Sequence, residues 1–341
     1  MTDKPIRVGV VGYGYWGPNL VRNVAGLEDA ELVVACDVSE ANLGRFASAY
    51  PNVATTSDIK AFVGDYDIDA AIVATSAPTH FDVASTVLSA GKHCFVEKPM
   101  SLTSGDAVSL VRAAEEAGVV LMVGHLMVYH SAIDWIKEYV DSGELGDVLY
   151  VYAQRLNLGK VRAEENAFWS LAPHDVSVIL HLLGEDPESV SASGAHYLRS
   201  GVHDVVFANI RFASGRFANI HVSWLDPHKV RKLTVVGTKK MLVFDDMQAT
   251  EKIWIYDKGV EPSQAMSYGE DLTLRFGDIT VPFVRMTEPL AIEVQHFLDC
   301  CANGKTPRSD GRAGLRVVQV LEAVDASMSA GGEPIPIDLE V

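Results

Sequence analysis

An apolar run followed by three spaced glycines occupies residues 8–17, which read Val-Gly-Val-Val-Gly-Tyr-Gly-Tyr-Trp-Gly. The run predicts a buried parallel strand, and a helical stretch follows over Asn19–Gly26. Gly12 permits a tight turn, Gly14 lets the backbone approach a pyrophosphate, and Gly17 lets helix and strand pack closely. The helix N-terminus offers amide groups and a positive dipole to phosphates. The pattern therefore predicts a dinucleotide-binding βαβ unit.

An acidic residue completes this unit. A second apolar run, Glu31–Cys36, ends in Asp37, about twenty residues beyond the glycines, where a carboxylate can bind a ribose diol. No Arg or Lys occurs in the next five residues, Val38-Ser39-Glu40-Ala41-Asn42. Because a carboxylate repels a 2′-phosphate, the sequence favours NAD over NADP.

Composition excludes several classes of protein. The 341 residues are 48% hydrophobic, which suits a folded chain of two domains. The net charge of −17 argues against a nucleic-acid partner, and no apolar stretch is long enough to span a membrane. Cys36, Cys94, Cys300 and Cys301 have no metal-ligand spacing, so we expect no metal site. We expect a cytoplasmic protein, since the N-terminus has no signal-peptide pattern and the cysteines do not suggest disulfides.

The chain changes character near residue 125. Before it, strand and helix patterns alternate, which predicts an α/β Rossmann fold with a doubly wound parallel sheet. After it come strand-like runs joined by short turns and then two helices, which predict an α+β domain with a large, mainly antiparallel open sheet. We therefore expect a dinucleotide-binding domain over residues 1–125, and a substrate-binding and oligomerisation domain over residues 126–341.

Two segments carry candidate chemistry. The predicted strand His93–Val96 ends in Glu97-Lys98-Pro99. Because ligands bind beyond the carboxyl ends of parallel strands, Lys98 would reach cofactor and substrate. Farther on, Pro173-His174-Asp175 precedes the helical run Val176–Leu183. Such residues also suit a helix start for structural reasons alone, so both interpretations of His174 stay open.

Together these motifs resemble the glucose–fructose oxidoreductase/inositol dehydrogenase family over essentially the whole chain. The matching pieces are the glycine loop, Ala74-Thr75 with His80, Glu97-Lys98-Pro99, His174-Asp175 and the segment 306–312. Within the family, residues 12–19, 155–159 and 169–175 look most like bacterial nucleotide-sugar 3-dehydrogenases. Those enzymes oxidise C3 of UDP-N-acetylglucosamine or of its uronic acid.

The resemblance implies the site. It places a set of residues against NAD: Gly12, Gly14, Tyr15, Trp16, Gly17, Asp37, Thr75, His80, Glu97 and Lys98. It places another set against the substrate: Lys98, Arg155, Asn157, Arg162, Trp169 and His174. The resemblance also makes the C-terminal sheet a subunit interface, so we expect a homodimer or a homotetramer.

The implied chemistry removes hydride from a sugar C3 while the hydroxyl proton passes to a base. His174 is our candidate base, with a reference pKa of about 6.5, and Lys98 would orient the hydroxyl and stabilise the developing oxyanion. The opposite assignment, with Lys98 as base, stays open. The family often carries Asp four residues before this histidine, where this chain has Ser170. Either Asp175 or another carboxylate then supports His174, or His174 acts alone.

Other residues have two interpretations each. Arg155 and Arg162 would bind a diphosphate or a uronate and Asn157 a sugar hydroxyl, but Arg155 also fits a solvated strand position. Trp169 would line the cofactor pocket or fill the core.

Three other functions compete with the leading one: an NAD(P)H-dependent 3-ketosugar reductase, a free-sugar or inositol dehydrogenase, and a catalytically silent dinucleotide-binding sensor. Asp37 disfavours an NADPH-dependent reductase, and the presence of both Lys98 and His174 argues against a silent sensor.

Overall fold

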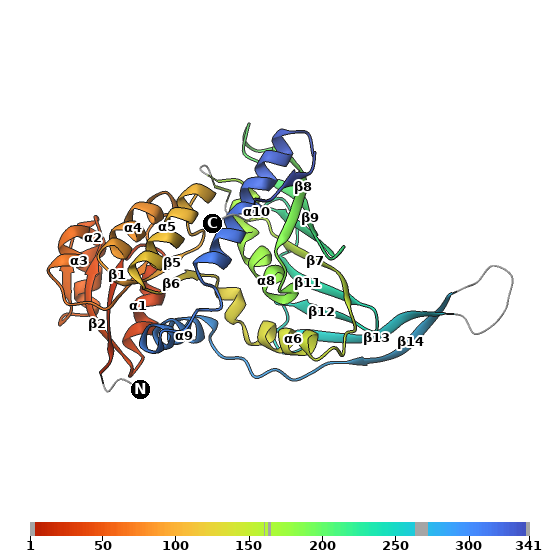
Figure 1. Ribbon diagram of the computed structural model, residues 1–341, viewed down its shortest axis with the longest axis horizontal. Coiled ribbons are helices and arrows are strands. Elements are labelled where there is room, and N and C mark those ends of the chain that lie inside the picture. Colours follow the sequence, from red (N-terminus) through yellow and green to blue (C-terminus); the bar gives the residue numbers. More distant parts are fainter. Residues whose placement is uncertain (1–3, 160, 163–164, 263–271, 339–341) are drawn as a thin grey trace. The chain divides into compact units, whose positions relative to one another are not determined.

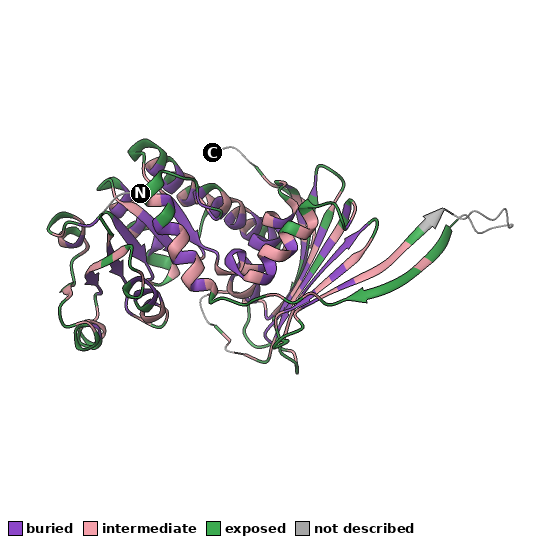
Figure 2. Ribbon diagram, turned by 90° about the horizontal axis from the view of Figure 1, so that it is seen from below, coloured by how far each residue is buried: buried purple, intermediate pink, exposed green. Residues whose placement is uncertain are grey.

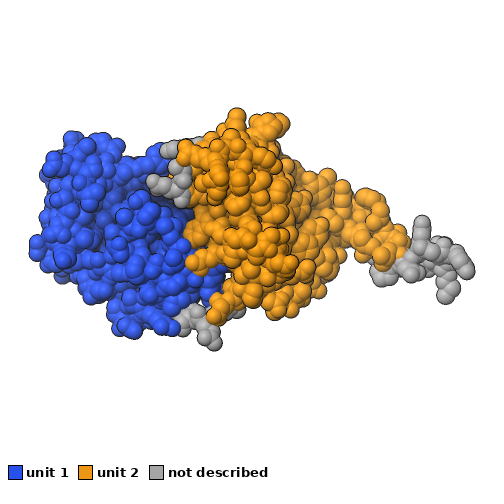
Figure 3. All heavy atoms as spheres, turned by 90° about the horizontal axis from the view of Figure 1, so that it is seen from above, with its two compact units in different colours: residues 1–129, 287–319, 340–341 blue, residues 130–286, 320–339 orange. Residues whose placement is uncertain are grey.

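The computed structural model describes residues 4–159, 161–162, 165–262 and 272–338. Contacts divide the chain into two compact units: unit 1 comprises residues 1–129 and 287–319, and unit 2 comprises residues 130–286 and 320–339 (Figure 3). Unit 2 thus begins close to the boundary predicted at residue 125. Unit 1 also contains residues 287–319, which the sequence-based division assigned to the second domain.

Unit 1 contains a six-stranded parallel sheet in the order β3-β2-β1-β4-β5-β6, which confirms the doubly wound Rossmann topology. Its strands are β1 (Ile6–Val11), β2 (Ala30–Cys36), β3 (Ala54–Thr56), β4 (Ala70–Val73), β5 (His93–Glu97) and β6 (Leu121–Gly124). Its helices are α1 (Gly17–Ala25), α2 (Glu40–Ala49), α3 (Ile59–Gly64), α4 (His80–Ser89), α5 (Ser104–Ala117) and α9 (Pro289–Asn303), with short 3-10 turns at Ala77–Thr79 and Leu126–Tyr129.

Each face of this sheet has its own apolar core. One core joins Val73 and Val96 to Leu110 of α5. The other joins Val10 to Leu20 of α1 and Phe297 of α9. Helix α9 therefore covers part of one face of the Rossmann sheet, although it lies far along the chain. Its amphipathic pattern predicts a helix but cannot identify the sheet on which it packs, which is why the sequence-based division placed it elsewhere.

Unit 2 contains a nine-stranded sheet in the order β14-β13-β12-β11-β7-β10-β9-β8-β15. Its neighbours are antiparallel except for the parallel pair β7 and β10, so the mainly antiparallel sheet is confirmed. The strands are β7 (Val148–Leu156), β8 (Pro187–Ala195), β9 (Val205–Phe212), β10 (Phe217–Ser223), β11 (Val230–Gly237), β12 (Met241–Asp245), β13 (Ile253–Pro262), β14 (Leu272–Thr280) and β15 (Ile335–Pro336). The helices are α6 (Ser131–Asp141), α7 (Ala167–Leu171) and α8 (Pro173–Leu183), and α10 (Gly311–Ser329) contributes residues to both units (Figure 1).

The two faces of the second sheet differ. Helices α7 and α8 contact β7, β9 and β10, and the alternate residues Val206, Ala208 and Ile210 of β9 are buried. On the opposite face, aromatic rings lie near the surface: Tyr150 stacks on Phe217 with ring centroids 5.2 Å apart. Figure 2 shows this alternation along the strands, and the largely exposed β14 beside them. One face is therefore a core, and the other is open.

Candidate active site

The glycine loop of unit 1 has the geometry that a dinucleotide requires. Gly12 has a φ of +97°, in the left-handed region, and a Cβ there would lie 2.7 Å from the backbone of Ala74. A Cβ on Gly17 would lie 2.1 Å from the carbonyl oxygen of Gly12, so this glycine lets α1 begin directly against the turn. A Cβ on Gly14 would meet nothing within 4 Å. The space beside Gly14 is thus open to a ligand that approaches the backbone.

The start of α1 adds to this site. Its N-cap residue, Trp16, makes no side-chain capping bond; Pro18 has no N–H, and the Asn19 amide donates to the Trp16 carbonyl at 2.9 Å. Of the first three helical residues, Gly17 therefore keeps an amide for a phosphate oxygen. The Tyr15 side chain is 96% exposed, which places a large aromatic ring in solvent beside the loop.

Asp37 follows β2 and is fixed by its neighbours. Its Oδ2 accepts from the Tyr13 amide at 2.7 Å and from Asn42 Nδ2 at 3.0 Å, and its Oδ1 accepts from the Ser39 amide at 2.8 Å. These bonds hold the carboxylate beside the glycine loop, where a ribose would bind.

Arg45 is a neighbour of this group that the sequence argument missed. Its Nη2 donates to the Tyr13 carbonyl at 2.9 Å and to Asn42 Oδ1 at 2.7 Å, and its guanidinium lies over the Tyr13 ring. Arg45 lies three residues beyond Asn42, just outside the segment Val38-Ser39-Glu40-Ala41-Asn42 that contains no basic residue. Arg45 therefore places a positive charge beside the loop that holds Asp37.

Glu97 and Lys98 follow one another at the carboxyl end of β5. Glu97 Oε1 accepts from Trp16 Nε1 at 2.7 Å, which ties the end of β5 to the start of α1. Glu97 pairs with Gly124 of β6, and a Cβ on Gly124 would lie 3.0 Å from the Glu97 carboxylate. Loss of hydration raises the pKa of Glu97 to about 7, although the nearby positive charge of Lys98 opposes that shift. Lys98 is half-buried and precedes a cis peptide bond to Pro99.

His80 connects two of these strand ends. Its Nδ1 lies 2.7 Å from the Pro99 carbonyl oxygen, and its Nε2 lies 3.1 Å from the Thr75 carbonyl oxygen. Burial lowers the pKa of His80, so the neutral form is favoured. The ten residues predicted to contact NAD thus lie at the carboxyl edge of one sheet, at the end of β5 or in the segments that follow β1, β2, β4 and β5. The described residues fit the cofactor, since they combine an open phosphate cradle with a fixed carboxylate.

In unit 2, His174 lies in the first turn of α8 and is partly exposed. Its carbonyl accepts from the Ser177 hydroxyl at 3.0 Å.

Asp175, the next residue, forms a buried ion pair. Its carboxylate accepts from Arg155 Nε at 2.7 Å and from Arg155 Nη2 at 3.0 Å, and each residue is 8% exposed. Burial would lower the pKa of Arg155, but the Asp175 charge and hydrogen bonds outweigh it and raise that pKa. Arg155 is therefore a buried residue and not a solvated strand residue. Asp175 was one candidate to support His174 in place of the Asp that the family often carries at position 170. Both of its oxygens bind the Arg155 guanidinium instead, so this carboxylate ties α8 to β7.

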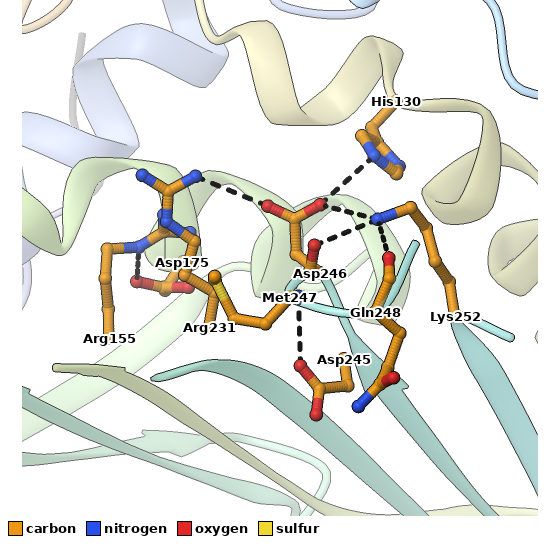
Figure 4. A network of polar contacts seen from close by, with 9 residues as sticks. All are labelled: His130, Arg155, Asp175, Arg231, Asp245, Asp246, Met247, Gln248 and Lys252. Carbon is orange, nitrogen blue, oxygen red and sulfur yellow. Dashed lines mark hydrogen bonds and ion pairs between the residues drawn. The ribbon is translucent and has the colours of Figure 1, made fainter. Parts of the chain in front are cut away.

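A second carboxylate, Asp246, lies close to this pair and is surrounded by basic side chains (Figure 4). It lies 3.4 Å from Arg231 Nη1, 3.4 Å from Lys252 Nζ and 3.5 Å from His130 Nε2. Burial would raise the pKa of Asp246, but the His130 hydrogen bond and the charges around it hold that pKa well below its usual range. His130 follows the last parallel strand, where a site residue is expected, but its partners come from β11 and from the turn between β12 and β13, so no local pattern predicts the cluster.

The remaining candidates occupy different surroundings. Trp169 is 8% exposed and donates from Nε1 to Asp325 Oδ2 at 2.6 Å, so it is anchored to α10. The backbone amide of Asn157 donates to the Ser223 carbonyl at 3.1 Å. The side-chain Oδ1 of Asn157 is buried and has no hydrogen-bond partner among the described residues. Arg162 is exposed and pairs with Glu165 at 3.0 Å.

The part of the chain that the structure describes holds no group of His, Cys, Asp or Glu residues arranged to bind a metal. Among the described helices, none is long and apolar enough to cross a membrane.

Comparisons with known proteins agree with these features. Residues 6–125 match the model of an oxidoreductase family with an NAD-binding Rossmann fold, and residues 133–243 match the GFO/IDH/MocA C-terminal domain. The chain is 28% identical over 332 residues to the UDP-N-acetylglucosamine 3-dehydrogenase of Acidithiobacillus ferrooxidans, covering 94% of this chain and 98% of that protein. The solved structure of that enzyme, GnnA, superimposes with a TM-score of 0.78 over 95% of this chain and 98% of its own.

Two further relatives broaden the comparison. An oxidoreductase structure from Magnetospirillum magnetotacticum MS-1 is 30% identical, with a TM-score of 0.78, over 94% of this chain and 99% of its own. The scyllo-inositol 2-dehydrogenase (NAD(+)) of Bacillus subtilis strain 168 is 27% identical over 89% of each chain.

Proposed function

This chain belongs to the GFO/IDH/MocA family of NAD-binding oxidoreductases, and we propose that it oxidises a hydroxyl group, at C3, of a nucleotide-activated sugar such as UDP-N-acetylglucosamine or its uronic acid. The observation that carries the proposal is the similarity to a UDP-N-acetylglucosamine 3-dehydrogenase over nearly the full length of both chains. The resemblance of residues 12–19, 155–159 and 169–175 to such enzymes supports the same substrate class.

NAD would be held by unit 1. The open space beside Gly14 and the uncapped start of α1 would receive the pyrophosphate, and Asp37 would bind the adenosine ribose. Bound NAD⁺ supplies the acceptor for the hydride that leaves the sugar carbon. Glu97 and Lys98, at the end of β5, would lie at the nicotinamide end of that site.

We assign two residues to the hydroxyl group. His174 would accept its proton, since its imidazole is partly exposed at the start of α8, where a ligand can reach it. Lys98 would donate a hydrogen bond to the same oxygen and stabilise the negative charge that develops on it. The ion pair between Arg155 and Asp175 would act through His174, because it fixes the first turn of α8 against β7.

A second candidate is oxidation of a free cyclitol or sugar, which the similarity to scyllo-inositol 2-dehydrogenase supports. The test is to supply NAD⁺ with UDP-N-acetylglucosamine, its uronic acid, a dTDP-sugar or scyllo-inositol, and to follow reduced nicotinamide. We expect turnover with a UDP-sugar and little with the cyclitol. Turnover with scyllo-inositol alone would replace the first proposal by the second.

We also propose that the open face of the second sheet joins subunits into a homodimer or homotetramer. Tyr152, Phe207 and Phe217 are exposed on that sheet, as are Leu274 and Phe276 of β14, and apolar surface of this kind is typical of a subunit interface. A monomer in light scattering at micromolar concentration would contradict this proposal.

A further inference from the structure

Helix α9 carries a glutamate inside the apolar core of unit 1. Glu293 is 0% exposed, and neither of its carboxyl oxygens has a hydrogen-bond partner among the described residues. Its neighbours on the helix, Leu290, Val294 and Phe297, belong to the core. A bare carboxylate in such a place is very costly, so the group avoids the cost by keeping its proton.

The packing of α9 places this glutamate beside Glu97. Glu293 and Phe297 are four residues apart and share one helix face, while Phe95 and Glu97 are two residues apart and share one face of β5. The Phe95 and Phe297 rings touch, with centroids 5.7 Å apart. Four helical residues and two strand residues each advance about 6 Å, and the Glu97 carboxylate lies against Gly124 of β6, next to the turn Leu126–Tyr129 that α9 contacts. Burial first, and the charge of Glu97 second, raise the pKa of Glu293 well above its usual value.

The other ionisable groups around this pair come from several elements. Lys98 follows Glu97, and its amide donates to Glu97 Oε2 at 3.2 Å. His125, after β6, is 1% exposed, and burial lowers its pKa to about 3, so it is neutral. Burial raises the pKa of Tyr129, which lies after β6, well above the usual range, so its hydroxyl keeps its proton. The Arg308 guanidinium and the His296 ring lie against the Tyr129 ring. Near neutral pH, the charge that varies beside Lys98 is therefore that of Glu97.

We propose that Glu293 is a neutral carboxylic acid beside Glu97, and that it acts as a positioning residue that sets the ionisation of Glu97 and thereby the charge beside Lys98. The inference rests on the proposed function only for the role of Lys98. Glu97 loses its proton to solvent at the partly exposed edge of the sheet, while the dipole of the neutral Glu293 acid stabilises the carboxylate that remains. With Glu97 ionised, the Lys98 ammonium is retained as the donor to the substrate oxygen.

The first test needs no substrate. If Glu293 is protonated in the folded protein and ionised in the unfolded chain, the folded state binds one more proton above the model-peptide pKa of about 4.3. The folding constant of the wild type, divided by that of Glu293→Gln, should then fall about tenfold per pH unit from pH 5 to pH 7. Glu288→Gln is the matched control. Glu288 precedes the same helix and pairs with Arg22, whose hydrogen bond lowers the pKa of that carboxyl, so the corresponding ratio should not fall with pH. A flat ratio for Glu293→Gln would overturn the proposal.

An infrared measurement keeps the proposal testable if Glu293→Gln does not fold. The wild type at pH 8 should show the carbonyl stretch of a protonated carboxylic acid, and Glu97→Gln should retain it. Absence of that band from the wild type would refute a neutral Glu293.

The second test follows Glu97 through Trp16, whose indole donates to it. Tryptophan fluorescence should titrate near pH 7, and this component should disappear in Glu97→Gln and in Trp16→Phe. Glu293→Gln should leave the midpoint of this titration unchanged, because the amide is also a neutral polar group. Glu293→Leu should raise the midpoint by about one pH unit, because the Glu97 carboxylate loses its polar neighbour. A midpoint that falls in Glu293→Gln would mean that Glu293 is charged, which would overturn the proposal. Failure of the substrate assignment would change neither titration.

Discussion

The cofactor edge of unit 1 and the polar cluster of unit 2 are built in opposite ways. The first depends on local backbone: three glycines within six residues, one helix start, and a carboxylate held by amides of its own neighbourhood. The second depends on pairs of charged side chains from distant segments, such as Arg155 with Asp175 and Asp246 with Lys252. A local arrangement of this kind can bind a ligand at little cost to the fold. In the second arrangement, each charged side chain needs its partner to remain stable in a buried position, so a substitution there changes both the polar cluster and the stability of the fold.

The largest effect should come from breaking the buried pair in unit 2. Asp175→Asn leaves the Arg155 guanidinium buried without its counter-charge, and the free energy of unfolding should fall by about 3–5 kcal/mol in urea titrations. The control is Glu115→Gln, which breaks an ion pair with Arg312 whose side chains are each 51% exposed. That change should cost about 0–1 kcal/mol. Equal losses in the two variants would show that the Arg155 pair does not stabilise unit 2.

The next effect concerns turnover rather than stability. His174→Asn and Lys98→Met should each lower kcat by roughly a hundredfold or more, because each removes an interaction made mainly in the transition state. NAD⁺ affinity, measured by calorimetry, should remain within a few-fold for His174→Asn. Ser170→Ala is the control, since at most it misorients the base. Wild-type turnover in His174→Asn would exclude the imidazole as the base.

A pair of glycine substitutions sharpens the contrast within unit 1. Gly17→Ala places a methyl group against the Gly12 carbonyl, so it should destabilise the protein by about 1–3 kcal/mol. Gly14→Ala meets no protein atom within 4 Å, so its melting temperature should match the wild type. Its NAD⁺ affinity should still fall by about tenfold, because the added methyl group occupies the approach of the pyrophosphate. A Gly14→Ala variant that unfolds but binds normally would reverse the roles assigned to the two glycines.

The same contrast explains what the sequence could predict. Strand period, glycine spacing and the ends of strands are local signals, so the topology of unit 1 and the edge that carries Gly12, Asp37 and Lys98 follow from short segments. The packing of α9 on that sheet does not, because an amphipathic helix shows that it is partly buried but not which surface buries it. Glu293 was missed for the same reason.

The ion pairs of unit 2 could not be predicted from the sequence either. Arg155 in a strand and Asp175 in a helix are 20 residues apart, and either would ordinarily be exposed. Their pairing appears only when α8 lies on β7. The antiparallel sheet itself followed from alternation, whereas the parallel pair β7 and β10 required knowledge of the strand order.

The smallest effect tests whether Asp37 alone selects the cofactor. In the wild type its carboxylate should repel a 2′-phosphate, so NADH should bind much more tightly than NADPH. Asp37→Ser removes the repulsion and leaves the positive charge of Arg45, which bonds to Asn42 and the Tyr13 carbonyl, beside this loop. The dissociation constant for NADPH, divided by that for NADH, should therefore fall by about tenfold. In Asp37→Ser with Arg45→Ala, part of that gain should be lost, because the phosphate would have no cation to meet. If the double variant binds NADPH as well as the single one, Arg45 has no part in selection, and repulsion by Asp37 accounts for the preference. If the wild type binds both cofactors equally, the local carboxylate does not discriminate, and the selectivity argument for unit 1 fails.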